Sequence, residues 1–465
     1  MFRSRITRHP VPFDPAAGRD ALEALAPPTD LSDLVAGTAG CSPYLAAAMA
    51  REAEWLSALW DREPEAALAD LLDEVAGIDG EPKGPLRKVK RRVALLVGLA
   101  ELGGVWPVME ATAALTRFAD AALDACLRYA MGRYGKRLPQ PFGGLAVLAM
   151  GKMGAFELNY SSDIDVVLLF DEALYDPGEY GEARAALLKI ARLAMAQMSE
   201  ITAEGYVFRT DLRLRPDPAS TPIVMSMEAA ERYYEAMGRT WERAAWIKAR
   251  AASGDVAAGA RFLDRLIPFV WRRHLDFAVV QDAREMRTRI RDHKGLGADW
   301  TVPGHDVKLG QGGIREIEFF TQTHQIIAGG RDPSLRVRGT LEGLNRLVAA
   351  GRVPAAEAEV LAREYPYLRA VEHRLQMVQD AQTHQSPKDA EGVRRLACFM
   401  GEADAGAFAA DLRARFEAVE AIVDPTFQPA RIAARTDAIA GAGAITDRWA
   451  TYPALRSERA RLILG

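Results

Sequence analysis

The chain has 465 residues, of which 49% are hydrophobic and 26% charged, with a formal net charge of −4. This length suggests about three domains of roughly 150 residues, and the apolar content is ample for buried cores. The slight acidic excess argues against a general nucleic-acid binder, and no run approaches the roughly 18 consecutive apolar residues of a membrane span.

The cysteines and the amino terminus indicate the cellular compartment in which the protein is expected. The three cysteines lie far apart at Cys41, Cys126 and Cys398, which favours neither a disulfide framework nor a cysteine-rich zinc site. Residues 1–15 include basic side chains but no apolar core of signal-peptide length. We therefore expect a soluble, cytoplasmic protein that makes no contact with a membrane.

The first part of the chain predicts helices. Residues 31–118 are rich in Ala, Leu, Glu and Arg, with apolar residues at helical spacing. Breaks are expected at Pro64, Gly80 and Pro82. A helix over about 111–131 then leads into the next region.

Two short apolar segments, 145–150 and 166–170, predict buried strands, and a turn is expected at 151–154. Asp163 and Asp165 stand two apart at the start of the second strand, so both carboxylates project to the same face. Divalent cations prefer oxygen ligands, and Mg²⁺ usually bridges one or two carboxylates to substrate phosphates. The pair therefore predicts a metal site.

Residues between these strands offer groups for an anion. Gly151 and Gly154 let backbone amides approach a phosphate, and Ser161 and Ser162 add hydroxyl donors beside the acids. Each short pattern alone is more often a plain turn. In this order between two strands, they predict that phosphate and metal meet at one place.

A third acid comes from the segment 206–215, which follows a helix predicted over 182–203. As a strand, this segment places Asp211, Arg213 and Arg215 on one face. The acid can then complete metal ligation, and the arginines can hold phosphates through paired N–H donors. The alternative is an edge strand with a charged, solvated face.

Two later segments allow two interpretations each. Residues 240–251 predict a helix from which Lys248 or Arg250 reaches a phosphate, or else a salt-bridged surface helix. The glycine run 310–313 precedes a helix whose amino terminus can bind an anion, although such a run is more often an interdomain turn.

The carboxy-terminal part returns to helices and is expected to form a bundle. Of Glu316 and Glu318, at most one is expected to face the metals. The helices are predicted over 314–328, 341–350, 355–382 and 404–423.

Five segments together resemble the bacterial glutamine synthetase adenylyltransferase/adenylyl-removing enzymes, and the resemblance covers nearly the whole chain. It implies an α+β, predominantly helical fold. A polymerase-β-like nucleotidyltransferase core with a small mixed sheet would be flanked by an N-terminal helical region and a C-terminal helical bundle. The five segments are 151–154, 157–165, 211–216, 241–250 and 308–319.

The resemblance also implies domain limits. We expect a helical region at 1–115, the catalytic core at 116–310, the bundle at 311–440, and a tail or the start of a linker at 441–465. Complete members of the family are about twice this long and carry two sites, so this chain resembles one half. Its motif Glu157-Leu158-Asn159 is that of the amino-terminal, adenylyl-removing half, whereas the other half typically has Glu-Leu-Gly-Tyr-Gly-Ser-Asp.

The activity implied by the resemblance is removal of AMP from a tyrosine of adenylylated glutamine synthetase by phosphorolysis, giving ADP. Asp163, Asp165 and Asp211 would be catalytic and would bind two Mg²⁺ ions, or Mn²⁺ as an alternative. Control by a PII-type signalling protein and by glutamine is also implied, without an indication of where either binds. The residues expected to hold nucleotide and phosphate are Gly151, Lys152, Gly154, Ser161, Ser162, Arg213, Arg215, Lys248 and Arg250.

Two alternatives remain. The same metals would serve the reverse direction, addition of AMP from ATP to glutamine synthetase, against which the Glu157-Leu158-Asn159 wording argues. The chain would otherwise be a catalytically silent domain that senses nucleotide or a PII protein, against which the three intact acids argue. Metal-dependent turnover, as opposed to simple binding, separates these alternatives.

Overall fold

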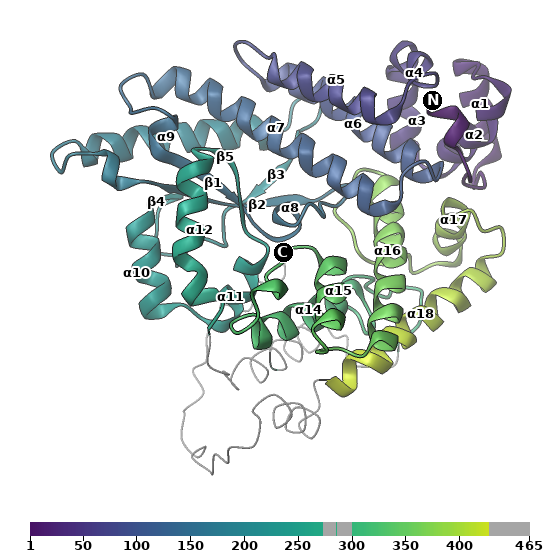
Figure 1. The fold of residues 1–465 in the computed structure, drawn as a ribbon. Coiled ribbons are helices and arrows are strands. Elements are labelled where there is room, and N and C mark those ends of the chain that lie inside the picture. The colour runs from purple at the N-terminus through teal and green to yellow at the C-terminus, as the bar shows by residue number, and fades with distance from the viewer. Residues whose placement is uncertain (273–284, 286–299, 427–465) are drawn as a thin grey trace.

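The computed structural model describes residues 1–272, 285 and 300–426. Helices surround one small mixed sheet (Figure 1), which confirms the predominantly helical α+β class expected from the sequence. The helices that precede the sheet are α1 (Pro15–Leu25), α2 (Ser32–Cys41), α3 (Pro43–Arg51), α4 (Ala53–Leu59), α5 (Pro64–Ala76), α6 (Lys83–Leu102) and α7 (Val108–Tyr134).

The helix starts in this region follow from local capping. The side chain of Asp14 accepts hydrogen bonds from the backbone at the start of α1, and Ser42 does the same for α3. The break expected at Pro64 is present, because α4 ends at Leu59 and Pro64 begins α5. Proline suits this first turn, where its missing N–H costs nothing. Gly80 and Pro82 lie between α5 and α6, as expected.

The sheet is built around β2, whose two neighbours on one edge are both parallel to it. On its other edge β2 pairs antiparallel with β1, and β1 pairs antiparallel with β5. On the first edge, β3 pairs with the start of β2 and β4 with its end. The strands are β1 (Leu145–Ala149), β2 (Asp163–Phe170), β3 (Arg209–Asp211), β4 (Val224–Ser226) and β5 (Arg250–Gly254).

Helices cover both faces of the sheet, which explains why β1 and β2 are apolar throughout. Val147 points into a core shared with α6, α7 and α9 (Tyr180–Ser199). Its neighbour Leu148 points into a second core on the other face, shared with α10, α11 and α12. These three helices are α10 (Met227–Met237), α11 (Thr240–Ile247) and α12 (Val256–Val270).

The last helices form a bundle with its own core, which includes Phe320, Leu344, Leu368 and Phe416. In this bundle α14 packs against α11, and α16 packs against α7, so the bundle is fixed beside the sheet domain (Figure 1). The helices are α14 (Ile314–Ala328), α15 (Thr340–Ala349), α16 (Ala355–Met377), α17 (Ala390–Met400) and α18 (Ala405–Thr426).

Three predicted elements end earlier than expected. The strand predicted over 206–215 is only three residues long, because the Asp211 carboxylate accepts a hydrogen bond from the backbone N–H of Arg213 at 2.8 Å and turns the chain. The helix predicted over 240–251 ends at Ile247 and is followed by β5, and the helix predicted over 355–382 ends at Met377.

The domain limits at residues 115, 310 and 440 stay predictions, and α7 runs through the first of them. The proposed tail at 441–465 lies outside the described residues. No described helix is both long enough and apolar enough to cross a membrane.

Candidate active site

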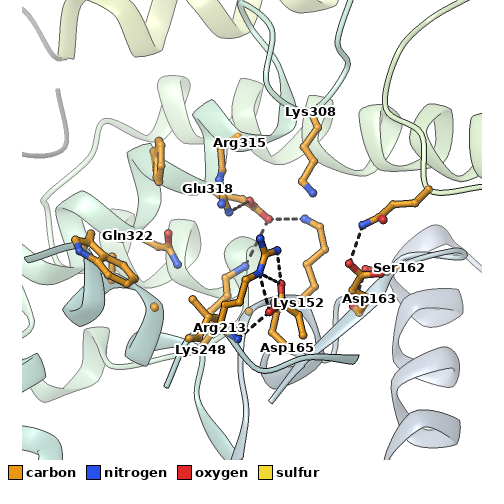
Figure 2. Close-up of a pocket in the computed structure, with 18 residues that line it drawn as sticks. Lys152, Ser162, Asp163, Asp165, Arg213, Lys248, Lys308, Arg315, Glu318 and Gln322 are labelled. Carbon is orange, nitrogen blue, oxygen red and sulfur yellow. Dashed lines mark hydrogen bonds and ion pairs between the residues drawn. The ribbon is translucent and has the colours of Figure 1, made fainter. Parts of the chain in front are cut away.

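A cavity of about 140 Å³ opens at the start of β2 and the end of β3, where the bundle meets the sheet domain. Both walls carry charged side chains (Figure 2). Of the residues predicted from the sequence to form the site, the following line this cavity: Gly151, Lys152, Ser162, Asp163, Asp165, Asp211, Arg213 and Lys248.

The three aspartates come together through the register of two parallel strands. Asp165 of β2 stands directly beside Asp211 of β3, and Asp163 stands beside Arg209. Burial, together with the negative charges of Asp211 and Asp163, raises the pKa of Asp165 to about 6. The site therefore contains a carboxylate that gains from a nearby positive charge.

Two of the acids are engaged by basic or amide side chains. Asp163 accepts hydrogen bonds from Nε of Arg209 at 2.6 Å and from Nε2 of Gln382 at 3.2 Å. Asp211 accepts a hydrogen bond from Nε of Arg213 at 2.8 Å. No hydrogen bond to the Asp165 carboxylate comes from any described residue.

The donor chemistry of these acids fits Mg²⁺, although the acids do not form a ready ligand cluster in the described residues. Within 1–272 and 300–426, no three acidic, histidine or cysteine side chains converge closely enough to hold a metal as they stand. The reason is that Asp163 and Asp211 face guanidinium groups. A divalent cation would replace those partners and relieve the repulsion at Asp165.

The turn predicted at 151–154 is a single helical turn, α8 (Gly151–Gly154). Gly151 has a φ of +51°, and a Cβ there would lie 3.0 Å from Oδ2 of Asp165, so glycine lets α8 approach the acid. Nζ of Lys152 lies 2.8 Å from Oε1 of Glu318, and burial lowers the pKa of this lysine to about 8.

Gly154 does not line the cavity, and its role is packing. A Cβ at this position would lie 2.0 Å from the backbone oxygen of Lys248. The close approach brings α8 against the end of α11. A phosphate-cradling role for Gly154 therefore has no support from its position.

Gly154→Ala is expected to lower the free energy of unfolding by about 1–3 kcal/mol, because the backbone of Lys248 has to move away from the new methyl group. Urea unfolding measures this effect. The matched control is Gly178→Ala, since no atom lies within 4 Å of a Cβ at Gly178. Unchanged stability of Gly154→Ala, together with weaker nucleotide binding, would contradict the packing role.

Three other predicted residues also lie away from the cavity. Ser161 is buried, and its backbone N–H donates to Oε1 of Gln376 at 2.8 Å, whereas Ser162 lines the cavity. Arg250 in β5 donates to both carboxylate oxygens of Asp120 at 2.7 Å.

Arg215 is the third, and its guanidinium is used to hold a loop. It donates to the backbone oxygens of Leu212 at 2.7 Å, Pro218 at 2.8 Å and Thr221 at 3.1 Å. The expectation that Arg213 and Arg215 share one strand face is wrong, because the strand ends at Asp211.

Lys248 is buried at the end of α11, so the surface-helix interpretation of this segment is wrong for it. Its Nζ lies 2.7 Å from Oε2 of Glu157 and 3.6 Å from Oε1 of Glu318. Thr340 of the bundle also binds Glu157, through a backbone N–H at 2.7 Å. Glu157 therefore joins the segment that carries the aspartates to the bundle.

Several cavity residues were not assigned to the site from the sequence. Some of them belong to segments that carry the family resemblance, so the resemblance could have identified those residues. Gln322 and Gln382 follow no motif, so only the fold reveals them. Of the two glutamates considered, Glu318 lines the cavity and Glu316 does not. The unassigned lining residues are Leu214, Trp241, Ala244, Ala245, Lys308, Arg315, Glu318, Phe319, Gln322 and Gln382.

Comparison with known proteins places this geometry in a family. The sequence matches the family described as "Glutamate-ammonia ligase adenylyltransferase" over residues 32–265, which is half of the chain. The chain belongs to this adenylyltransferase family. A second description, "GlnD PII-uridylyltransferase", matches residues 283–427. The nucleotidyltransferase class predicted from the sequence is confirmed.

Relatives of this adenylyltransferase family share a single name, "Bifunctional glutamine synthetase adenylyltransferase/adenylyl-removing enzyme". One from Bradyrhizobium sp. (strain BTAi1) is 48% identical over 82% of this chain. Others from Bradyrhizobium diazoefficiens and Xanthobacter autotrophicus are 44% and 45% identical over 88% and 87% of it. The chain spans only 40–42% of the length of these three relatives.

Proposed function

We propose that this chain removes AMP from adenylylated glutamine synthetase by metal-dependent phosphorolysis, and so regulates nitrogen assimilation in the cytoplasm. The observation that carries the proposal is one cavity in which three aspartates face a set of basic side chains. The shared name of the relatives supports glutamine synthetase as the protein substrate. The wording Glu157-Leu158-Asn159 favours the adenylyl-removing direction.

The acids and bases of the cavity would have separate roles. Asp163, Asp165 and Asp211 would hold two Mg²⁺ ions, or Mn²⁺ in their place. Bound there, the metal would neutralise phosphate charge and stabilise the departing tyrosine oxygen. Arg213 and Lys152 would bind the adenylyl phosphate and compensate its charge.

No strong general base is needed in this scheme, because inorganic phosphate is already an anion at neutral pH. The protein has to bring two negatively charged phosphates together, with the attacking and leaving oxygens on opposite sides of the adenylyl phosphorus. A cavity lined by basic side chains beside the acids meets this demand.

The test is to mix the chain with adenylylated glutamine synthetase, Mg²⁺ and phosphate, and to follow ADP release together with loss of the adenylyl group. We expect ADP that depends on both phosphate and metal. Transfer of AMP from ATP to unmodified glutamine synthetase, without ADP release from the adenylylated form, would favour the adding direction instead. Nucleotide binding without either reaction would favour a silent sensor.

Control by a PII-type protein and by glutamine belongs to the same proposal. The match of residues 283–427 to the family described as "GlnD PII-uridylyltransferase" supports a connection with PII signalling.

A further inference from the structure

Lys308 differs from the other basic side chains of the cavity. Figure 2 shows its side chain pointing into the cavity from the side opposite Asp165. Lys152 and Lys248 are each paired with a buried glutamate, and Arg213 is paired with Asp211. Across the described part of the chain, no side chain forms a hydrogen bond or an ion pair with the Lys308 ammonium.

The backbone around Lys308 is held by hydrogen bonds, although its side chain has no hydrogen-bond or ion-pair partner among the described residues. Oδ1 of Asp306 accepts hydrogen bonds from the N–H groups of Lys308 at 3.0 Å and Leu309 at 2.8 Å. The backbone oxygen of Lys308 accepts from the N–H of Arg315 at 2.9 Å, at the start of α14. These hydrogen bonds fix the backbone from which the Lys308 side chain extends into the cavity.

Arg315 stands next to this position on the bundle wall. Its Nη1 lies 3.3 Å from Oε2 of Glu318, but its Nε is buried and has no hydrogen-bond acceptor among the described residues. A buried donor without an acceptor is costly, and so is a lysine charge in a cavity that is attracted to Asp165 but forms no ion pair with a described residue. Both costs are relieved when an anion occupies the space between the two residues.

We infer that Lys308 and Arg315 form the subsite for the attacking inorganic phosphate, on the wall opposite the aspartates. This inference rests on the proposed phosphorolysis and says where its second substrate, inorganic phosphate, binds. The adenylyl phosphate belongs beside the aspartates and Arg213. Lys152 and Lys248 are held on the sheet side of the cavity by buried glutamates. Lys308, which forms no ion pair with a described residue, is on the bundle side and supplies charge for a second phosphate.

This placement suits an in-line displacement. An oxygen of HPO₄²⁻ forms a bond to the adenylyl phosphorus while the bond from that phosphorus to the tyrosine oxygen breaks. The proton of HPO₄²⁻ passes to the tyrosine oxygen, so the products are ADP and unmodified tyrosine. The attacking group enters from the bundle side, and the leaving group departs on the opposite side of the phosphorus.

Lys308→Gln is expected to raise the KM for phosphate by about 10–100-fold, the value of one charge-assisted hydrogen bond. The KM for adenylylated glutamine synthetase is expected to stay within about twofold, since that substrate does not use the subsite. Lys308→Arg keeps the charge and is expected to restore part of the phosphate affinity. The control is Lys388→Gln, at an exposed lysine away from the cavity.

A second measurement separates this inference from the proposed function. Thermal stabilisation by inorganic phosphate with Mg²⁺ reports binding without turnover. If the parent chain forms no ADP but is stabilised by phosphate, and Lys308→Gln is not, the subsite stands and phosphorolysis fails. If the parent chain forms ADP and Lys308→Gln keeps its KM for phosphate, the subsite is wrong and phosphorolysis stands. If the parent chain neither forms ADP nor is stabilised by phosphate, the subsite and the proposed phosphorolysis are both wrong.

Discussion

Asp165→Asn is expected to reduce ADP formation by at least about 10³-fold and to leave the fold intact. The carboxylate stands between Asp163 and Asp211, and asparagine is a neutral, weaker ligand for a hard divalent cation. The measurement is the rate of phosphate-dependent ADP release at saturating Mg²⁺. Asp163→Asn is expected to behave in the same way, and activity that survives in both variants would remove the aspartates from the mechanism.

The same variant is expected to be more stable than the parent chain when metal is absent. The folded pKa of Asp165 is about 6, above the value of 3.8 for an unperturbed aspartate. Ionisation of this group therefore opposes folding, with a penalty that grows as the pH rises from about 4 to about 6 and is complete above pH 6. Asp165→Asn removes that penalty and should raise the free energy of unfolding by about 1–3 kcal/mol at pH 8. The gain should shrink as the pH falls from 6 to 4, because the acid becomes protonated in both states.

Urea unfolding in the presence of a chelator, at pH 8 and at pH 4, measures this difference. Asp171→Asn is a suitable control, because Asp171 follows β2 outside the cavity and forms an ion pair with Arg261. A loss of stability at pH 8 in Asp165→Asn would show that the carboxylate is not repelled by its neighbours.

Arg369→Met is expected to destabilise the protein by about 3–5 kcal/mol, the effect of breaking a fully buried charge network. The guanidinium has no exposed surface and donates to the backbone oxygen of Glu157 at 2.6 Å and to Oδ1 of Asn159 at 2.7 Å. It also lies 3.4 Å from the buried carboxylate of Glu372. Methionine fills similar space but removes the donor to the oxygens of Glu157 and Asn159 and takes one positive charge away from Glu372, which keeps His384.

The control for this prediction lies on the same helix. Arg363 in α16 is largely exposed and pairs with Glu364, so Arg363→Met should cost no more than about 1 kcal/mol. Urea unfolding compares the two variants. Equal midpoints would show that the Arg369 network contributes little to holding the bundle on the sheet domain.

The parts of the site that sequence reasoning found are those fixed by local pattern. The apolar strands, the spacing of Asp163 and Asp165, and a third acid on the next strand are all readable along the chain. In the structure, Asp211 falls beside Asp165 because β2 and β3 are parallel and in register. The family resemblance added the fold class, which neither composition nor periodicity alone would specify.

The parts that sequence reasoning missed depend on contacts between distant segments. Arg215 follows the period of a strand in the sequence, but hydrogen bonds to nearby backbone oxygens hold it in a loop. Gln382 reaches Asp163 from 219 positions away, and packing of the bundle brings it there. Glu157 belonged to a diagnostic motif, yet its buried contact with Thr340 has no local signal.

The two walls of the cavity belong to segments that match two different family descriptions. The aspartates lie within residues 32–265, and Lys308, Arg315 and Glu318 lie within residues 283–427, which match a different family description. Neither segment contains the full set of charged groups. A chimera that exchanges either segment alone would therefore replace one wall of the cavity, so that the carboxylates of one protein would face the cations of another.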